Sequence, residues 1–113
     1  MSCIFCKIAS GEIPSRMVYQ DEYIVAVEDI NPVAPLHLLL LPRKHIINTL
    51  DLLPEDDALI GHLHRVAAML ASERGVAESG FRIVTNTNAD AGQSVFHIHF
   101  HLLAGRGLAW PPG

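Results

Sequence analysis

Three histidines, His97, His99 and His101, alternate with apolar residues toward the end of the 113-residue chain. Successive side chains of a β-strand point to opposite faces, so the three imidazoles are expected to share one face. The residues between them are expected to point into a core: Phe96, Ile98, Phe100 and Leu102. Imidazole is the side chain best suited to proton transfer, metal ligation and nucleophilic attack near neutral pH.

Three interpretations of this row are open. The histidines could be polar residues on a solvated strand face, although such faces usually mix Thr, Lys, Glu and Ser. They could hold a zinc ion that keeps one open position for an activated water. In the third interpretation His99 is a nucleophile, and the imidazoles on either side set its tautomer and donate protons.

A glycine-containing turn over residues 90–94 lies two residues before the row. Backbone N–H groups of such a turn can bind a phosphate, and Ser94 adds a hydroxyl. The turn alone is a weak signal. Next to the histidine row, it favours phosphoryl chemistry over simple metal hydrolysis.

The two cysteines, Cys3 and Cys6, have the spacing of a redox pair, a disulfide or half a zinc site, or they are two small buried thiols. The N-terminus lacks a basic region followed by an apolar stretch, so we predict no signal peptide and expect a cytoplasmic location. That compartment disfavours a structural disulfide. No βαβ pattern surrounds the pair, which disfavours a thioredoxin-like role.

Short elements must position these residues. Residues 3–9 predict a short helix that ends at Gly11, and two prolines within residues 31–35 predict a rigid loop. A long helix is predicted from Pro54 to near Gly75, with one buried stripe at Leu59, Leu63, Val66 and Leu70.

Five segments are predicted to be strands: residues 17–20, 23–29, 37–41, 81–85 and 95–103. The first two indicate a hairpin, the third is apolar enough to be buried on both faces, and residues 86–92 indicate a polar loop. We predict an α+β fold with an antiparallel sheet of five strands, covered on one face by helix.

Composition excludes several classes of protein. Half of the residues are hydrophobic and the formal charge is −4, so one packed domain is expected rather than a disordered chain. No apolar run approaches the roughly 18 to 20 residues that cross a membrane. Eight scattered Lys and Arg residues lack the charge pattern of a protein that binds duplex nucleic acid, so a nucleotide ligand would be small.

The chain resembles the histidine triad superfamily, and within it the Hint branch of purine nucleoside phosphoramidases. The resemblance rests on His97 to Leu103 and extends over nearly the whole chain. The other matching segments are Cys3-Ile-Phe-Cys-Lys-Ile, Glu12-Ile-Pro, Asp29-Ile-Asn-Pro-Val-Ala-Pro-Leu-His37, Leu41-Pro-Arg-Lys-His45, Gly92-Gln-Ser-Val-Phe-His97 and Trp110-Pro-Pro-Gly113. The resemblance implies a single domain over residues 1–113, with one long and one short helix, that pairs into a homodimer with a ten-stranded sheet.

The resemblance also implies a reaction. His99 would attack the α-phosphorus of a purine nucleoside 5′-phosphoramidate, expel the amine and form a nucleotidyl-histidine that water hydrolyses. The backbone near His97 would hold the other ring nitrogen of His99. His101, Ser94 and the Val95 N–H would bind phosphate oxygens or the leaving group, and His37 would stand behind His101 as a proton reservoir.

Further roles follow from the same resemblance. Asp29 would accept hydrogen bonds from the ribose hydroxyls, and Asn86 would contact ribose or phosphate. The other residues implied in substrate binding are Ile30, Gly92 and Gln93, and the apolar side chains offered to the purine are Phe5, Ile8, Ile13 and Val27. A structural zinc ion would be held by Cys3, Cys6, His45 and His97, while catalysis would need no cofactor. His62 and His64 match no motif.

Other functions stay open. Within the superfamily, the chain could hydrolyse dinucleoside polyphosphates or act as a nucleotide phosphorylase. It could also be a nucleotide-binding dimer whose catalysis is vestigial. A three-histidine zinc hydrolase is weakened by the cysteine pair, which offers zinc softer ligands.

Overall fold

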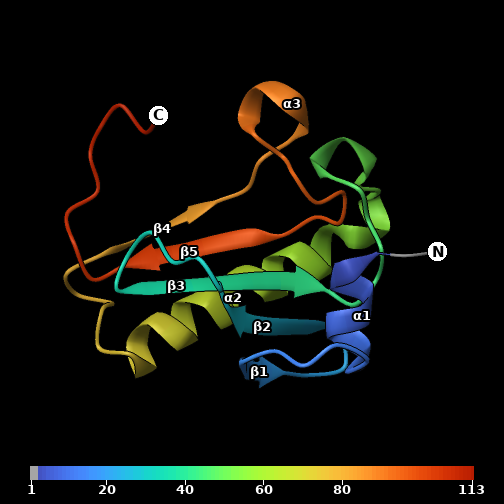
Figure 1. The fold of residues 1–113 in the computed structure, drawn as a ribbon, viewed down its shortest axis with the longest axis horizontal. Coiled ribbons are helices and arrows are strands. Elements are labelled where there is room, and N and C mark those ends of the chain that lie inside the picture. The colour runs from blue at the N-terminus through green and yellow to red at the C-terminus, as the bar shows by residue number, and fades with distance from the viewer. Residues whose placement is uncertain (1–2) are drawn as a thin grey trace.

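The computed structural model describes residues 3–113. Five antiparallel strands form one sheet in the order β1-β2-β3-β5-β4 (Figure 1). The strands are β1 (Met17–Gln20), β2 (Ile24–Glu28), β3 (Leu36–Pro42), β4 (Phe81–Val84) and β5 (Phe100–Ala104). This confirms the predicted α+β class and its five-stranded sheet. Pairing of two such sheets in a dimer stays a prediction.

The helices begin and end near the predicted residues. Helix α1 (Ile4–Ser10) starts where the Cys3 thiol accepts the Cys6 N–H, and it stops at Gly11, whose φ of 85° is readily available to glycine. Helix α2 (Asp57–Glu73) follows a single helical turn, Pro54–Asp56, in which proline occupies the first position.

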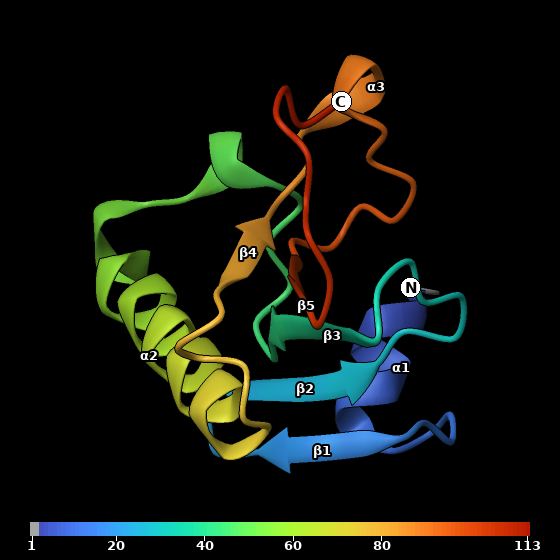
Figure 2. The same ribbon diagram turned by 90° about the vertical axis from the view of Figure 1, so that its left-hand side faces the viewer.

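Helices pack on both faces of the sheet (Figure 2). Leu63, Val66 and Leu70 of α2 are buried in one core, against the even-numbered residues of β3. On the other face, Phe5 of α1 packs among four strand residues: Val25, Val27, Leu39 and Leu41. The expectation that one face is covered was therefore incomplete. The short helix shields part of the second face and leaves the part beside β5 to the histidines.

The last strand is shorter than predicted. Residues 95–97 bend, and regular pairing with β3 and β4 begins at Phe100. Phe96 is 52% exposed, so its predicted place in the core was wrong, because a residue in the bend does not follow the alternation of the strand. Ile98, Phe100 and Leu102 are buried as predicted. The predicted loop at 86–92 contains a short helix, α3 (Asn88–Ala91).

No helix within residues 3–113 combines the length and the apolar character that a membrane span needs. This agrees with the absence of a long apolar run in the sequence.

Candidate active site

The His99 imidazole has a defined tautomer. Its Nδ1 lies 2.8 Å from the carbonyl oxygen of His97, and because a carbonyl only accepts, Nδ1 carries the proton. The Nε2 of His99 then keeps its lone pair. The ring is 8% exposed and meets the Phe5 ring edge to face, with centroids 4.9 Å apart. The Thr85 hydroxyl donates to the His99 carbonyl at 2.9 Å, which holds the backbone in place. His99 has the geometry of an oriented nucleophile.

A second chain of hydrogen bonds leads to His101. The Val33 N–H donates to Nδ1 of His37 at 3.1 Å, so the proton of His37 is on Nε2. The Nε2–H of His37 donates to Nδ1 of His101 at 2.9 Å. An Asp29 carboxylate oxygen lies 3.3 Å from Nε2 of His37. With its Nδ1 accepting, His101 carries its own proton on Nε2. The rings of His99 and His101 lie 5.2 Å apart between centroids.

The surroundings of His37 and His101 keep both imidazoles neutral near pH 7. Burial, together with the electrostatic effect of the neighbouring His99 and His37 rings, lowers the pKa of His101 to about 4, and Asp29 acts in the opposite direction. Burial also lowers the pKa of His37, again against the attraction of Asp29. A neutral His101 with its proton on Nε2 presents one hydrogen-bond donor on that nitrogen.

This shift predicts how stability depends on pH. Between pH 7 and 5 the unfolded His101 takes up a proton at its ordinary pKa of 6.5, whereas the folded imidazole does not. The contribution of His101 to the unfolding free energy is present above pH 6.5. It is lost as pH falls toward 4, and the loss reaches up to about 2 kcal/mol at pH 5. We expect urea denaturation at pH 7, 6 and 5 to show this loss and His101→Asn to reduce it. Equal pH dependence in both proteins would contradict the assignment.

The turn before the histidines is exposed on its outer side. Ser94 and Gly92 are exposed, and Gly92 ends α3 with a φ of 86°. Val95 is half-buried and packs with the core cluster of α1, on the face that carries His99. Asn86 is half-buried just beyond β4. The Gln93 side chain is instead buried and points inward, so only its backbone is available to a ligand in this turn.

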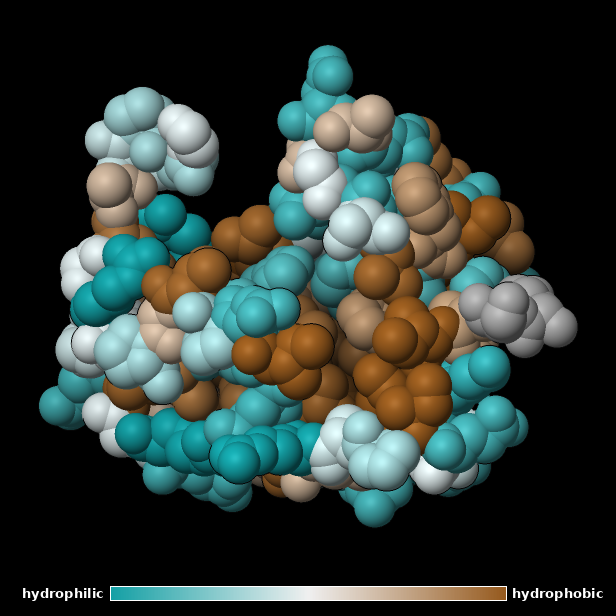
Figure 3. Space-filling view, viewed as in Figure 1, coloured by the Kyte–Doolittle hydropathy of each residue, from teal (hydrophilic) through white to brown (hydrophobic). Residues whose placement is uncertain are grey.

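The residues expected near ribose and base lie on the α1 face or its rim. Asp29 is partly buried and accepts the Asn31 N–H at 2.7 Å, whereas Ile30 beside it is 92% exposed. The apolar set divides: Phe5 and Val27 are buried, Ile8 is half-buried in the same cluster, and Ile13 is half-buried outside it. Figure 3 shows apolar surface gathered over α1 on this face.

Cys3, Cys6, His45 and His97 form one cluster, as the resemblance implied. Their ligand atoms all lie within 4.8 Å of one another. His97 is fully buried, and its Nε2–H donates to the Pro42 carbonyl at 2.8 Å, which leaves Nδ1 facing the cysteines. Nδ1 of His97 lies 3.4 and 3.5 Å from the sulfurs of Cys3 and Cys6 and 3.2 Å from Nδ1 of His45.

The donor set fits zinc. A tetrahedral zinc ion with Zn–N bonds of about 2.0–2.1 Å and Zn–S bonds of about 2.3 Å keeps its ligands roughly 3.3–3.8 Å apart. Four of the separations between these ligand atoms, at 3.2–3.5 Å, are close to this range. Four protein ligands leave no open position, which is typical of a structural ion. His97 links the two sites, because its imidazole faces the cysteines while its carbonyl orients His99.

Sequence reasoning missed an ion pair at His62. Nε2 of His62 lies 2.6 Å from the Asp21 carboxylate, which also accepts the Tyr19 hydroxyl at 2.7 Å. Burial acts to raise the pKa of Asp21, but these bonds and two backbone N–H groups outweigh it and hold the pKa far below its ordinary value. Forty-one residues separate Asp21 from His62, so no local pattern could have signalled the pair. His64 is exposed on α2.

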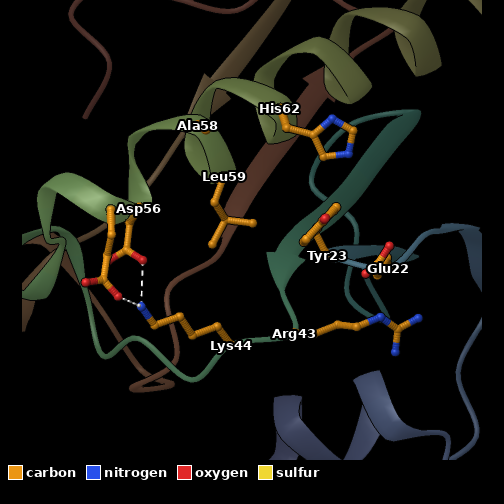
Figure 4. Close-up of a pocket in the computed structure, with 9 residues that line it drawn as sticks. Glu22, Tyr23, Arg43, Lys44, Asp56, Ala58, Leu59 and His62 are labelled. Carbon is orange, nitrogen blue, oxygen red and sulfur yellow. Dashed lines mark hydrogen bonds and ion pairs between the residues drawn. The ribbon is translucent and has the colours of Figure 1, made fainter.

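His62 also lines a cavity of about 640 Å³ at the start of α2 (Figure 4). Lys44 also lines the cavity, and its ammonium group pairs with the Asp56 carboxylate at 2.7 Å. The cavity lies beside α2, whereas His99 lies on the α1 face of the sheet. Its other lining residues are Glu22, Tyr23, Arg43, Glu55, Ala58 and Leu59. The cavity contains none of the histidine row.

The fold and the site together define a histidine triad protein: an antiparallel sheet in which the last strand and the segment just before it bring alternating imidazoles to one face. The HIT domain family model matches residues 10–108, and the chain belongs to this family.

Named relatives agree with this assignment. The chain is 47% identical over 105 residues to the purine nucleoside phosphoramidase of Escherichia coli K12, covering 93% of this chain and 88% of that protein. A crystal structure of a HIT family hydrolase from Legionella pneumophila superposes with a TM-score of 0.98 at 48% identity, over 99% of this chain and 100% of that one. A zinc-bound histidine triad family protein from Mycobacterium smegmatis gives 0.80 at 35% identity, over 94% and 76%.

Proposed function

We propose that this protein is a hydrolase that cleaves the P–N bond of purine nucleoside 5′-phosphoramidates through a nucleotidyl-histidine intermediate. The observation that carries the proposal is the free Nε2 lone pair of His99, oriented by the bond from its Nδ1–H to the His97 carbonyl. The identity to the Escherichia coli phosphoramidase supports the substrate class.

In the first step, Nε2 of His99 attacks the α-phosphorus. A P–Nε2 bond forms, the P–N bond of the substrate breaks, and the departing amine takes a proton from Nε2 of His101 or from the Ser94 hydroxyl. His37, hydrogen-bonded to His101, supplies the proton reservoir behind it. The Val95 N–H and Ser94 stabilise the charge that grows on the non-bridging oxygens.

In the second step, water attacks the phosphorus, the P–Nε2 bond to His99 breaks, and the water gives its proton to the group that protonated the amine, His101 or Ser94. The products are the nucleoside 5′-monophosphate and the regenerated imidazole. Asp29 holds the ribose hydroxyls, with Ile30 beside it, and Asn86 and the backbone of Gly92 and Gln93 lie toward ribose and phosphate. The purine lies against the apolar residues around α1. A zinc ion held by Cys3, Cys6, His45 and His97 would contribute structure, and neither step uses it.

We further propose a cytoplasmic homodimer in which two sheets pair at an edge. Strand β4 ends the sheet and carries the partly exposed Phe81. An unpaired edge with an apolar side chain favours strand pairing with a second copy.

The test compares substrates with different bonds to phosphorus. We expect adenosine 5′-phosphoramidate, its guanosine counterpart and an AMP–lysine conjugate to release nucleoside monophosphate, measured by chromatography or ³¹P NMR. Diadenosine polyphosphates should turn over more slowly. Faster cleavage of the polyphosphates would replace the proposal with a dinucleoside polyphosphate hydrolase, and binding without turnover would indicate a nucleotide-binding protein.

A further inference from the structure

Two buried amide side chains join the loop that follows β3 to the loop that precedes β5. Asn48 is 4% exposed and Gln93 is 7% exposed, yet neither belongs to the hydrophobic core. Buried polar groups of this kind are costly unless their hydrogen bonds are made. Their partners show what they hold together.

Gln93 uses every donor of its amide, and its oxygen accepts twice. Its Oε1 accepts the Asn88 N–H at 2.9 Å and Nδ2 of Asn48 at 3.2 Å. Its Nε2 donates to the carbonyls of Ile47 at 2.8 Å and Val95 at 3.2 Å. One side chain therefore ties both ends of the 88–95 segment to the loop after β3.

Asn48 completes the connection. Its Oδ1 accepts the Leu50 N–H at 3.0 Å, and its Nδ2 donates to the Asn88 side chain at 3.1 Å as well as to Gln93. Asn88 has a φ of 66°, a left-handed conformation that non-glycine residues seldom adopt without support. The two amides supply that support through the backbone and side chain of Asn88.

We infer that Asn48 and Gln93 are positioning residues that hold the 92–95 turn in the conformation in which it binds the substrate phosphate. This inference rests on the proposed function, in which Ser94 and the Val95 N–H stabilise the phosphate oxygens. The outer side of the turn is exposed, so the hydrogen bonds on its inner side set the direction of these groups. The amide pair therefore contributes to recognition of the phosphate and leaves recognition of the nucleoside to Asp29 and the apolar residues.

Gln93→Glu and Asn48→Asp test this with almost no change in side-chain size. Gln93→Glu replaces the amide nitrogen, which donates both bonds, with one carboxylate oxygen that faces the carbonyls of Ile47 and Val95. Asn48→Asp keeps an acceptor for the Leu50 N–H but removes both donated bonds. Asn48→Ala removes the same bonds without adding a charge, and it serves if the acidic variants fail to fold.

The readout is the affinity for AMP compared with the affinity for adenosine, measured by NMR titration. We expect AMP affinity to fall about tenfold or more in these variants, the scale of one lost hydrogen bond to a charged group, with adenosine affinity within about twofold of the parent. Leu63→Ala, in the core of α2, is the matched control: it should lower the melting temperature and preserve the ratio.

Two results in the variants would overturn the inference. Equal losses for AMP and adenosine would show that the amides support the fold in general, and unchanged AMP affinity would show that the turn holds its conformation without them. If the parent protein bound AMP no more tightly than adenosine, the proposed phosphate site itself would be wrong, and the inference would fail with it.

Discussion

His99→Asn is expected to lower kcat for adenosine 5′-phosphoramidate by about 10⁴-fold or more, the scale seen when an enzyme loses its nucleophile. The imidazole Nε2 forms the bond to phosphorus, and the asparagine amide offers no comparable lone pair. Asparagine retains an N–H of similar position that can still donate to the His97 carbonyl, the partner of His99 Nδ1 at 2.8 Å. The fold should survive, as judged by circular dichroism and thermal melting.

Mass spectrometry of acid- or base-quenched mixtures checks the same step directly. The parent protein should carry a nucleotidyl group on His99, with the quench chosen to preserve the P–N bond, and the variant should carry none. His64→Asn is the matched control, because it removes an exposed imidazole on α2. An active His99→Asn protein, or a nucleotidyl group on another residue, would contradict the mechanism.

Removal of zinc is expected to cost about 4 kcal/mol of unfolding free energy when free zinc exceeds its dissociation constant a thousandfold. Cys3 caps the start of α1 and Cys6 lies within it, His45 follows β3, and His97 precedes β5. The ion would therefore connect three segments that are distant in the sequence. Elemental analysis of protein purified without a histidine tag should find one zinc per chain, and chelation should lower the melting temperature.

Cys6→Ala should abolish stoichiometric zinc and reproduce the effect of chelation. His64→Ala is the control, because it removes an exposed imidazole outside the cluster. Because the His97 carbonyl accepts a hydrogen bond from the Nδ1–H of His99, we also expect the ¹⁵N signals of the His99 ring to shift on zinc removal. A metal-free preparation with an unchanged melting temperature would disprove a stabilising ion.

Local patterns in the sequence were sufficient for most elements of the fold, apart from α3 and the start of β5. The stripe at Leu63, Val66 and Leu70 predicts α2, and the apolar run before Pro42 predicts a strand buried on both faces. These predictions succeed because helices and strands repeat every 3.6 and 2 residues, so burial leaves a periodic mark. The alternation of the histidines likewise placed their imidazoles on the face opposite Ile98 and Phe100. Resemblance, rather than periodicity, supplied the four members of the cysteine–histidine cluster.

Only the tertiary structure decided which atoms of those residues face one another. The Nε2 lone pair of His99, the orientation of His101 through His37, and the amide pair of Asn48 and Gln93 each depend on hydrogen bonds between separate segments. Two further features have the same origin: the bend that exposes Phe96, and the ion pair between Asp21 and His62. The sequence by itself determined most of the helices and strands and which histidines share one face. Their chemistry required the fold, because a tautomer is set by a partner that no local spacing reveals.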